Sequence, residues 1–249
     1  MNFLISGASS GLGKELFNSL SKNPNYNFFL LSKNINGLKK IKEINEQVKI
    51  YHLDLNEIDK TKIITNQILE DSQNKIDVII CNAAEGAFGS INDIPTDIFL
   101  SNFNVNFFSH LILIKAIYPG MKSRDFGHII NISSGAGIFG FKHSSSYSIS
   151  KSCMQILIES MHMENINNNI YAKNIFPGLM NTNFENKNKY YNNKERVFFL
   201  KKKETNLIAD KIIKNIFSKK LNIFCQLNTI TAFIIKLFPI LEKIRKIIF

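Results

Sequence analysis

Short apolar runs alternate with longer stretches of helical spacing along almost the whole chain, and this alternation restricts the fold more than any other feature. In the longer stretches, apolar residues recur every three or four positions, as at Leu12, Leu16 and Leu20, or at Leu38, Ile41 and Ile44. Strands that alternate with helices predict right-handed βαβ units and a parallel sheet with helices on both faces. We expect strands at residues 3–5, 28–31, 48–53, 78–81, 129–132, 170–176 and 221–225.

The length and composition of the chain suit one large α/β domain. It has 249 residues, of which 45% are hydrophobic and 20% charged, and this excludes a wholly disordered or fibrous chain. No internal repeat and no long linker interrupts the alternation. We expect a single doubly wound domain over residues 1–227. It includes an excursion rich in Asn, Lys and aromatic residues at 183–203, and an apolar, basic tail at 228–249 follows it.

The formal charge of +11, from 31 Lys and Arg against 20 Asp and Glu, prompts a search for an anionic partner. The basic residues are spread along the chain without a DNA- or RNA-binding motif, so nucleic acid is not expected. In the tail, apolar residues are mixed with Lys236, Lys243, Arg245 and Lys246. Such a helix can lie in a membrane interface, pack on its own domain, or join copies of the chain.

The sequence indicates neither a metal site nor a targeting segment. Cys81, Cys153 and Cys225 form no CxxC pair, and the five histidines show no HxxxH or HExxH spacing. The apolar run at 3–5 is too short for a signal peptide, and no stretch of about 20 apolar residues exists. We therefore expect a cytoplasmic protein, with peripheral attachment to the inner face of a membrane through the tail as the alternative.

A glycine-rich turn follows the first expected strand directly and opens a helical pattern. Such a turn lets backbone N–H groups approach a pyrophosphate, and the helix N-terminus adds partial positive charge. The spacing is Gly-x3-Gly-x-Gly rather than GxGxxG, but the position between strand and helix favours dinucleotide binding. The candidate phosphate-binding residues are Ser6, Gly7, Ser9, Ser10, Gly11, Leu12 and Gly13.

The end of the second expected strand, Ser32-Lys33, bears on which dinucleotide is bound. A carboxylate at this point favours NAD, whereas a basic group accommodates the 2′-phosphate of NADP. Because Lys33 is basic and Ser32 is no carboxylate, NADP(H) is favoured and NAD(H) is the alternative. The competing interpretation of Lys33 is an ordinary solvated lysine.

A proton-transfer pair is indicated by Tyr147 and Lys151, which lie four positions apart and share one face of a helix. The ordinary pKa of a tyrosine is about 10, and an adjacent ammonium favours the phenolate. The pair could therefore exchange a proton with an alcohol or carbonyl oxygen. Ser134, at the end of the strand near residue 130, could hydrogen-bond the same oxygen.

Taken together, these residues stand in the order found in the short-chain dehydrogenase/reductases, and the chain resembles that family over residues 2–182. Ser134 precedes Tyr147 by 13 residues, the spacing usual in the family. The resemblance implies a Rossmann-type sheet with strand order 3-2-1-4-5-6-7. It also implies an NAD(P)(H)-dependent oxidoreductase of carbonyl or alcohol substrates, acting as a homodimer or homotetramer. The matching segments are Ser6-Gly7-x3-Gly11-x-Gly13, Asp54-Leu55, Asn82-Ala83-Ala84, Val105-Asn106, Ser134, Tyr147-x3-Lys151 and Pro177-Gly178-x3-Thr182.

The resemblance also implies a role for each matching residue. Tyr147 would be the general acid/base, while Lys151 would lower its pKa and hold the nicotinamide ribose. Ser134 would orient the substrate oxygen, and Asn106 would hold a water that links Lys151 to solvent. Ser6 replaces the usual Thr, Cys81 a common Asn and Ala84 a common Gly, but none of these departures removes a reacting group. The further cofactor contacts would be Asp54, Leu55, Asn82, Ala83, Ala84, Pro177, Gly178 and Thr182.

The substrate itself is not identified by these motifs. Phe139, Phe141 and His143 lie between Ser134 and Tyr147, where the family lines its substrate pocket, and residues 183–203 are the expected lid. The Lys, Arg and Tyr content of the lid suits an anionic or sugar-like molecule, or an acyl chain at a membrane. The alternative function is a catalytically silent NAD(P)-binding regulator or scaffold, tethered through the C-terminal helix.

Overall fold

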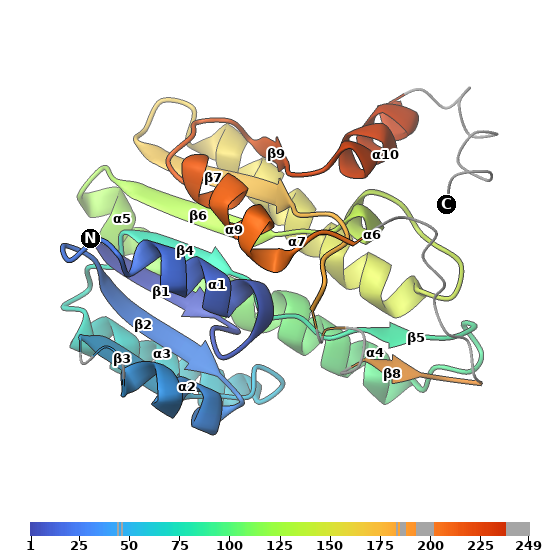
Figure 1. The fold of residues 1–249 in the computed structure, drawn as a ribbon, viewed down its shortest axis with the longest axis horizontal. Coiled ribbons are helices and arrows are strands. Elements are labelled where there is room, and N and C mark those ends of the chain that lie inside the picture. Colours follow the sequence, from blue (N-terminus) through green and yellow to red (C-terminus); the bar gives the residue numbers. More distant parts are fainter. Residues whose placement is uncertain (44, 46, 183, 185–187, 193–201, 238–249) are drawn as a thin grey trace.

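Seven parallel strands form the central sheet of the computed structural model, in the order β3-β2-β1-β4-β6-β7-β9 (Figure 1). The structure describes residues 1–43, 45, 47–182, 184, 188–192 and 202–237. All seven expected strands and the expected doubly wound order are confirmed. The strands are β1 (Asn2–Ser6), β2 (Asn27–Ser32), β3 (Val48–His52), β4 (Val78–Cys81), β6 (Gly127–Ile132), β7 (Ile170–Phe176) and β9 (Asn222–Phe224).

Helices cover both faces of this sheet (Figure 1). Side chains of α1 (Gly11–Leu20), α2 (Ile35–Lys42) and α9 (Thr205–Lys214) join one apolar cluster, and those of α3 (Ile58–Asp71), α5 (Ser109–Ser123) and α7 (Ser145–Glu164) join another. Along β1, Phe3 and Ile5 enter the first cluster and Leu4 the second. Because β1, β2 and β4 are buried on both faces, they are continuous apolar runs, whereas the edge strand β3 carries the exposed residues Lys49 and His52.

Several short elements gather where the central strands end. The two-residue strands β5 (Ala87–Phe88) and β8 (Lys189–Tyr190) pair in parallel, and α4 (Thr96–Phe103) leads through a π-helical turn, η1 (Asn104–Phe108), into α5. The helix α6 (Gly135–Ile138) follows β6 and packs against α7. The alternation of apolar runs did not predict β5, β8 or η1, and they lie at the edge where the predicted site residues lie (Figure 1).

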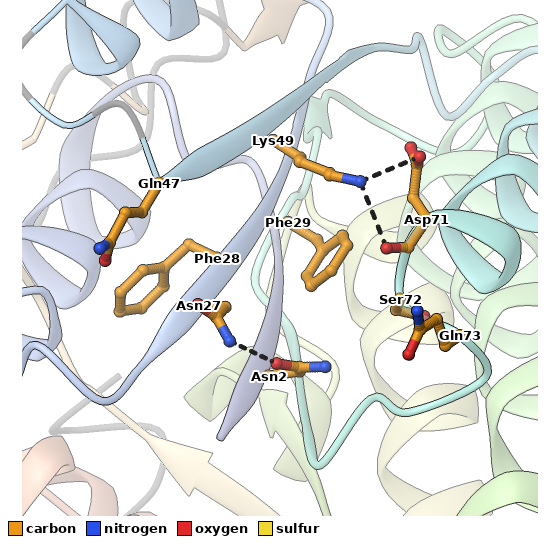
Figure 2. Close-up of a pocket in the computed structure, with 9 residues that line it drawn as sticks. All are labelled: Asn2, Asn27, Phe28, Phe29, Gln47, Lys49, Asp71, Ser72 and Gln73. Carbon is orange, nitrogen blue, oxygen red and sulfur yellow. Dashed lines mark hydrogen bonds and ion pairs between the residues drawn. The ribbon is translucent and has the colours of Figure 1, made fainter.

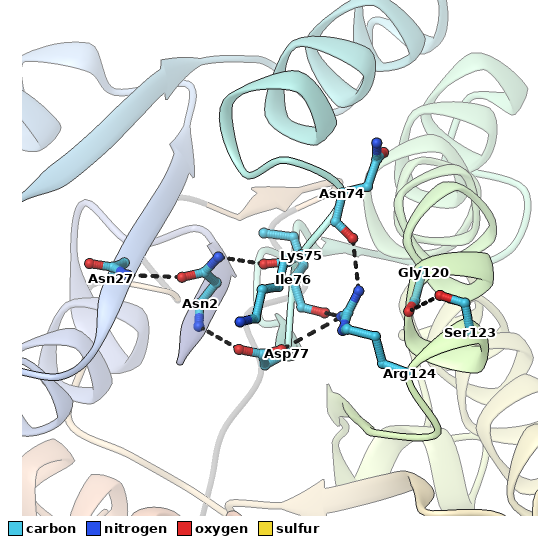
Figure 3. Close-up of polar contacts among 9 residues, drawn as sticks. All are labelled: Asn2, Asn27, Asn74, Lys75, Ile76, Asp77, Gly120, Ser123 and Arg124. Carbon is cyan, nitrogen blue, oxygen red and sulfur yellow. Dashed lines mark hydrogen bonds and ion pairs between the residues drawn. The ribbon is translucent and has the colours of Figure 1, made fainter.

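The opposite, amino edge of the sheet is held by polar contacts of its own. Asp77 accepts a hydrogen bond from Asn2 N at 2.9 Å and lies 3.6 Å from Arg124, whose guanidinium also donates to two backbone carbonyls (Figure 3). A pocket of about 230 Å³ opens beside β1, β2 and β3 at this edge, next to the Lys49–Asp71 ion pair at 3.0 Å (Figure 2). It is lined by residues other than those predicted for the site.

The tail begins as a helix, α10 (Leu227–Leu237), which packs against α6 and β9. Leu227, Ile230 and Ile234 are exposed on it. Within the described part of the chain, no helix is both long enough and apolar enough to cross a membrane. The predicted basic residues at 243, 245 and 246 lie outside the described residues, as does Ile44 of the second predicted helix.

Candidate active site

The sheet order reverses between β1 and β4, and their carboxyl ends therefore border a crevice of the kind in which open α/β sheets bind ligands. Ser6 ends β1, and its Oγ accepts hydrogen bonds from Asn82 N at 2.9 Å and Ala83 N at 3.0 Å. Asn82 Nδ2 donates in return to Ser6 O at 3.0 Å. The predicted residues Asn82 and Ala83 thus lie directly against the glycine-rich turn.

The glycine-rich turn has a backbone conformation that favours glycine. Gly7 and Gly11 have φ angles of 67° and 53°, in the left-handed region. A Cβ on Gly13 would stand 2.4 Å from Gly7 O, and one on Gly11 would stand 3.7 Å from Thr182 Cγ2, so Thr182 lies across the turn. The first turn of α1, which the structure describes in full, carries no acidic residue to compensate the helix dipole. The turn therefore fits a pyrophosphate.

A buried histidine contacts the first residue of the glycine-rich turn, and no sequence motif assigns it a role. His110 Nε2 lies 2.9 Å from Ser6 Oγ, and the side chain is inaccessible to solvent. Burial, with a contribution from Lys151, lowers the pKa of His110 to about 3, so the ring is neutral at neutral pH. The one signal in the sequence was its position four residues after Asn106, on the same helical face.

The predicted catalytic residues meet at the same edge of the sheet. Tyr147 and Lys151 lie on α7, both buried, and Lys151 Nζ donates to Ile132 O at 2.9 Å. Asn106 Nδ2 donates to Ser150 Oγ on α7 at 2.9 Å. Ser134 is the N-cap of α6, which packs against α7. Burial lowers the pKa of Lys151 to about 8, so this lysine can gain or lose a proton near neutral pH.

Aromatic side chains surround Tyr147 and form what we term the aromatic wall: Phe88, Phe141, Phe184 and Tyr190. The ring centroids of Phe88 and Phe184 each lie 5.8 Å from that of Tyr147. Tyr190 stacks on Phe88 at 5.5 Å across the β5–β8 pair. Phe141 was expected in a pocket wall, and Phe184 and Tyr190 lie in the segment expected to be the lid. Phe88 was not expected, because no periodicity marks a two-residue strand such as β5.

The other two residues of the predicted pocket loop differ from each other. Phe139 packs with Ile138 and Phe176 in a separate cluster, away from the aromatic wall. His143 has a φ of 61°, and its carbonyl accepts a hydrogen bond from Gly89 N at 2.9 Å. It therefore joins the loop before α7 to the segment after β5, next to the aromatic wall.

The remaining predicted cofactor residues lie along the same edge. Ser32 Oγ is 2.7 Å from Ser9 Oγ, and Lys33 forms an ion pair with Glu85. Gly178 has a φ of 79° and is packed against Gln226, whose amide donates to Pro177 O and Leu179 O. Glu85 and Gln226 were not predicted, since both contacts join segments far apart in the sequence. Of the expected lid, residues 183, 185–187 and 193–201 lie outside the described residues.

Known proteins resemble this chain in sequence and in fold. Human retinol dehydrogenase 8 is 31% identical over 191 residues, which are 74% of this chain and 60% of the relative, so the chain spans about 60% of that protein's length. A short-chain dehydrogenase from Sphingobium yanoikuyae in complex with NADPH has a TM-score of 0.81 at 18% identity, covering 98% of this chain and 93% of the other. One from Burkholderia phymatum in complex with NAD has a TM-score of 0.83 at 16% identity, covering 97% and 94%.

The match to a protein family covers the whole crevice. The family model described as short chain dehydrogenase matches residues 2–192, from the first strand of the sheet through the end of β8. This range contains the glycine-rich turn and the residues gathered on and beside α7. The chain therefore belongs to the short-chain dehydrogenase family of oxidoreductases.

Proposed function

We propose that this chain is an NADP(H)-dependent carbonyl reductase that uses Tyr147 as its general acid/base. The observation that carries the proposal is that Tyr147 and Lys151 lie on α7, which is in contact with Asn106 and with the helix that Ser134 caps, beside the crevice that the glycine-rich turn borders. The proposed proton-transfer groups and the proposed phosphate-binding turn thus belong to one edge of the sheet.

The turn and its neighbours would hold the dinucleotide. First-turn N–H groups of α1 would bind the pyrophosphate, and Lys33 would bind the 2′-phosphate of the adenosine ribose. When bound, the nicotinamide supplies or accepts the hydride. Both an NADPH and an NAD complex occur among proteins of the same fold, so the preference for NADP rests on the basic Lys33 and on the absence of a carboxylate at Ser32. The other proposed contacts are Asp54, Leu55, Asn82, Ala83, Ala84, Pro177, Gly178 and Thr182.

Tyr147 would complete the reaction by moving the proton. In the direction of reduction, the Tyr147 hydroxyl would give its proton to the oxygen of the carbonyl that is reduced, which would leave an alcohol and a tyrosinate. The Lys151 ammonium stabilises the tyrosinate and can supply the next proton, because its pKa of about 8 lies near working pH. Ser134 Oγ would hold the substrate oxygen in place.

The aromatic wall supports a substrate whose body is apolar. Phe88, Phe141 and Phe184 would bury the part of the molecule next to the reacting carbon, and burial of apolar area supplies most of such binding energy. The name of the human relative, a retinol dehydrogenase, is consistent with an apolar alcohol. We place the catalytic unit in residues 1–227, and the assignment of the whole protein's activity is part of this proposal.

The test is the substitution Tyr147→Phe, assayed with NADPH and a panel of aromatic, aliphatic and charged carbonyl compounds. The wild type should oxidise NADPH with the apolar members of the panel, and Tyr147→Phe should lower kcat by about 10³-fold or more. The dissociation constant for NADPH should stay within about twofold, because the phenyl ring preserves the packing. Equal turnover by the two proteins would refute the mechanism. A wild type that binds NADPH tightly but reduces nothing would favour the silent regulator.

A further inference from the structure

One ion pair joins two segments that both border the crevice. Lys33, just after β2, pairs with Oε1 of Glu85, which follows the Asn82–Ala84 segment at the end of β4. The partners are 52 residues apart, whereas Lys60–Glu57 and Lys62–Asp59 each lie within one helical turn. In the sheet, β1 lies between β2 and β4, so the Lys33–Glu85 pair spans the edge at which the glycine-rich turn begins.

Both partners are anchored through their backbones. Glu85 N donates to Asn106 Oδ1 at 2.8 Å, and Asn106 Nδ2 donates to Glu85 O at 2.8 Å. On the other side, Lys33 O lies 3.1 Å from His52 Nε2, and Ser32 Oγ accepts from Asn34 N at 3.1 Å. The Lys33 side chain is 57% exposed and that of Glu85 29%. An exposed ion pair of this kind adds little to the free energy of unfolding. We therefore consider its effect on the ligand that the crevice binds.

We infer that Glu85 is a specificity-determining residue that opposes the 2′-phosphate of the dinucleotide. This inference rests on the proposed function, which places that phosphate at Lys33. A 2′-phosphate must take the Lys33 ammonium away from the Glu85 carboxylate, and it then lies close to an anion that has lost its partner. A dinucleotide with a free 2′-hydroxyl faces neither cost, because a hydroxyl can donate a hydrogen bond to the carboxylate.

Glu85 therefore narrows the preference for NADPH over NADH that Lys33 creates. The discrimination depends on a repulsive element as well as an attractive one, which is a common way to set specificity. Through its side chain, Glu85 acts where the 2′-phosphate of the adenosine ribose would lie. Through its backbone, Glu85 holds Asn106 in the catalytic part of the crevice. A change confined to the side-chain charge separates these two roles.

The experiment compares wild type, Glu85→Gln, Lys33→Gln and the double variant by titration with NADPH, NADH and 2′,5′-ADP. Glu85→Gln should bind NADPH and 2′,5′-ADP about fivefold more tightly and NADH no more tightly, so the NADPH-to-NADH ratio rises. In the Lys33→Gln background, the gain from Glu85→Gln should be smaller, since no ion pair remains to be broken. The gain should also shrink at about 0.5 M salt.

Glu164→Gln is the matched control, because Glu164 is exposed at the far end of α7 and its replacement removes the same charge. Its affinities should equal those of the wild type. If wild type binds NADPH or NADH and Glu85→Gln leaves their ratio within twofold, Glu85 does not set specificity and the proposed function is untouched. If Glu85→Gln raises the affinity for NADPH and for NADH by the same factor, the effect comes from the change in net charge, and the inference also fails. If wild type binds neither, the proposed function itself fails.

Discussion

Among the described residues, two lysines are buried in the interior of the protein, one toward each edge of the sheet, and they have different surroundings. Lys151, on α7 at the carboxyl edge, donates to one carbonyl, that of Ile132. Lys173, on β7, donates to two, those of Ile216 and Ser218, just after α9. Burial lowers the pKa of each to about 8. Burial therefore disfavours the charged form of both lysines to a similar extent. The ammonium of Lys173, however, also hydrogen-bonds carbonyl groups at the end of a helix, as basic groups commonly do.

The difference teaches that a buried cation is not by itself a mark of catalysis. The contacts of Lys173 join β7 to the chain just after α9 and account for its place in the fold. Lys151, in contrast, lies on the same helix as the buried Tyr147 and as Ser150, which accepts a hydrogen bond from Asn106 beside the crevice. Perturbed groups gather at functional sites, yet structural networks perturb pKa values as well. Geometry at the carboxyl edge, and not the shift in pKa, separates the two lysines.

The largest expected effect comes from replacing each lysine with methionine, which has a similar length and no charge. Lys151→Met should lower kcat about 100-fold or more, because the tyrosinate loses its stabilising ammonium. Lys173→Met should keep kcat and KM within about twofold. Steady-state kinetics on both variants, with folding checked by circular dichroism, measures the contrast. A comparable loss of turnover in both would show that the lysines are not functionally distinct.

The next expected effect is on how the free energy of unfolding depends on pH. The folded protein releases the proton of Lys173 at a lower pH than the unfolded chain does. Between the folded pKa of about 8 and the ordinary 10.5, the unfolded chain binds more protons, so the free energy of unfolding rises with pH. This gain is about 3 kcal/mol over that window. It is absent below pH 8, where the lysine is charged in both states.

Lys173→Met lacks this group, and its stability curve should therefore be flatter than that of the wild type above pH 8, by about 3 kcal/mol at pH 10.5. Urea unfolding at pH 7.5, 9 and 10.5 measures the two curves, and Lys151 contributes equally to both. Asp59→Asn, which alters an exposed ion pair without removing a buried cation, is the control and should run parallel to the wild type above pH 8. Parallel curves for Lys173→Met and the wild type would contradict the assignment.

The sequence predicted the sheet well and the contacts across the crevice poorly. Strands such as β1, β2 and β4 are short apolar runs bounded by polar residues. Such a run can be recognised from neighbouring residues alone, without knowledge of the fold. Lys173 lies inside such a run at 170–176, and nothing local distinguishes its buried ammonium from an ordinary lysine. The aromatic wall depends on Phe88 and Tyr190, which pair across two strands of two residues each. Local sequence carries no information about a pairing made by chain segments about a hundred residues apart.

The same limit applies to the motifs. Tyr147, Lys151 and Ser134 were predicted because their spacing is fixed within a helix and its preceding strand. The contact of Ser6 with His110 joins α5 to the end of β1, and the ion pair of Lys33 with Glu85 joins loops after two different strands. Such long-range pairs follow from the sheet order, which had to be known before they could be derived.

The smallest expected effect concerns the histidine that accompanies each lysine. Burial, with a contribution from the nearby lysine, lowers the pKa of His110 to about 3 and of His128 to about 4. His110 contacts Ser6 at the start of the glycine-rich turn, whereas His128 packs between Tyr171 and Phe217, and its buried Nδ1 has no hydrogen-bond partner in the described part of the chain.

His110→Phe should weaken NADPH binding about fivefold, the effect of one lost hydrogen bond, and leave kcat at saturating cofactor nearly unchanged. His128→Phe should bind NADPH as the wild type does, and titration of both variants decides whether support of the turn is specific to the carboxyl edge. If the two histidine variants lose equal affinity, His110 acts through general packing rather than through Ser6.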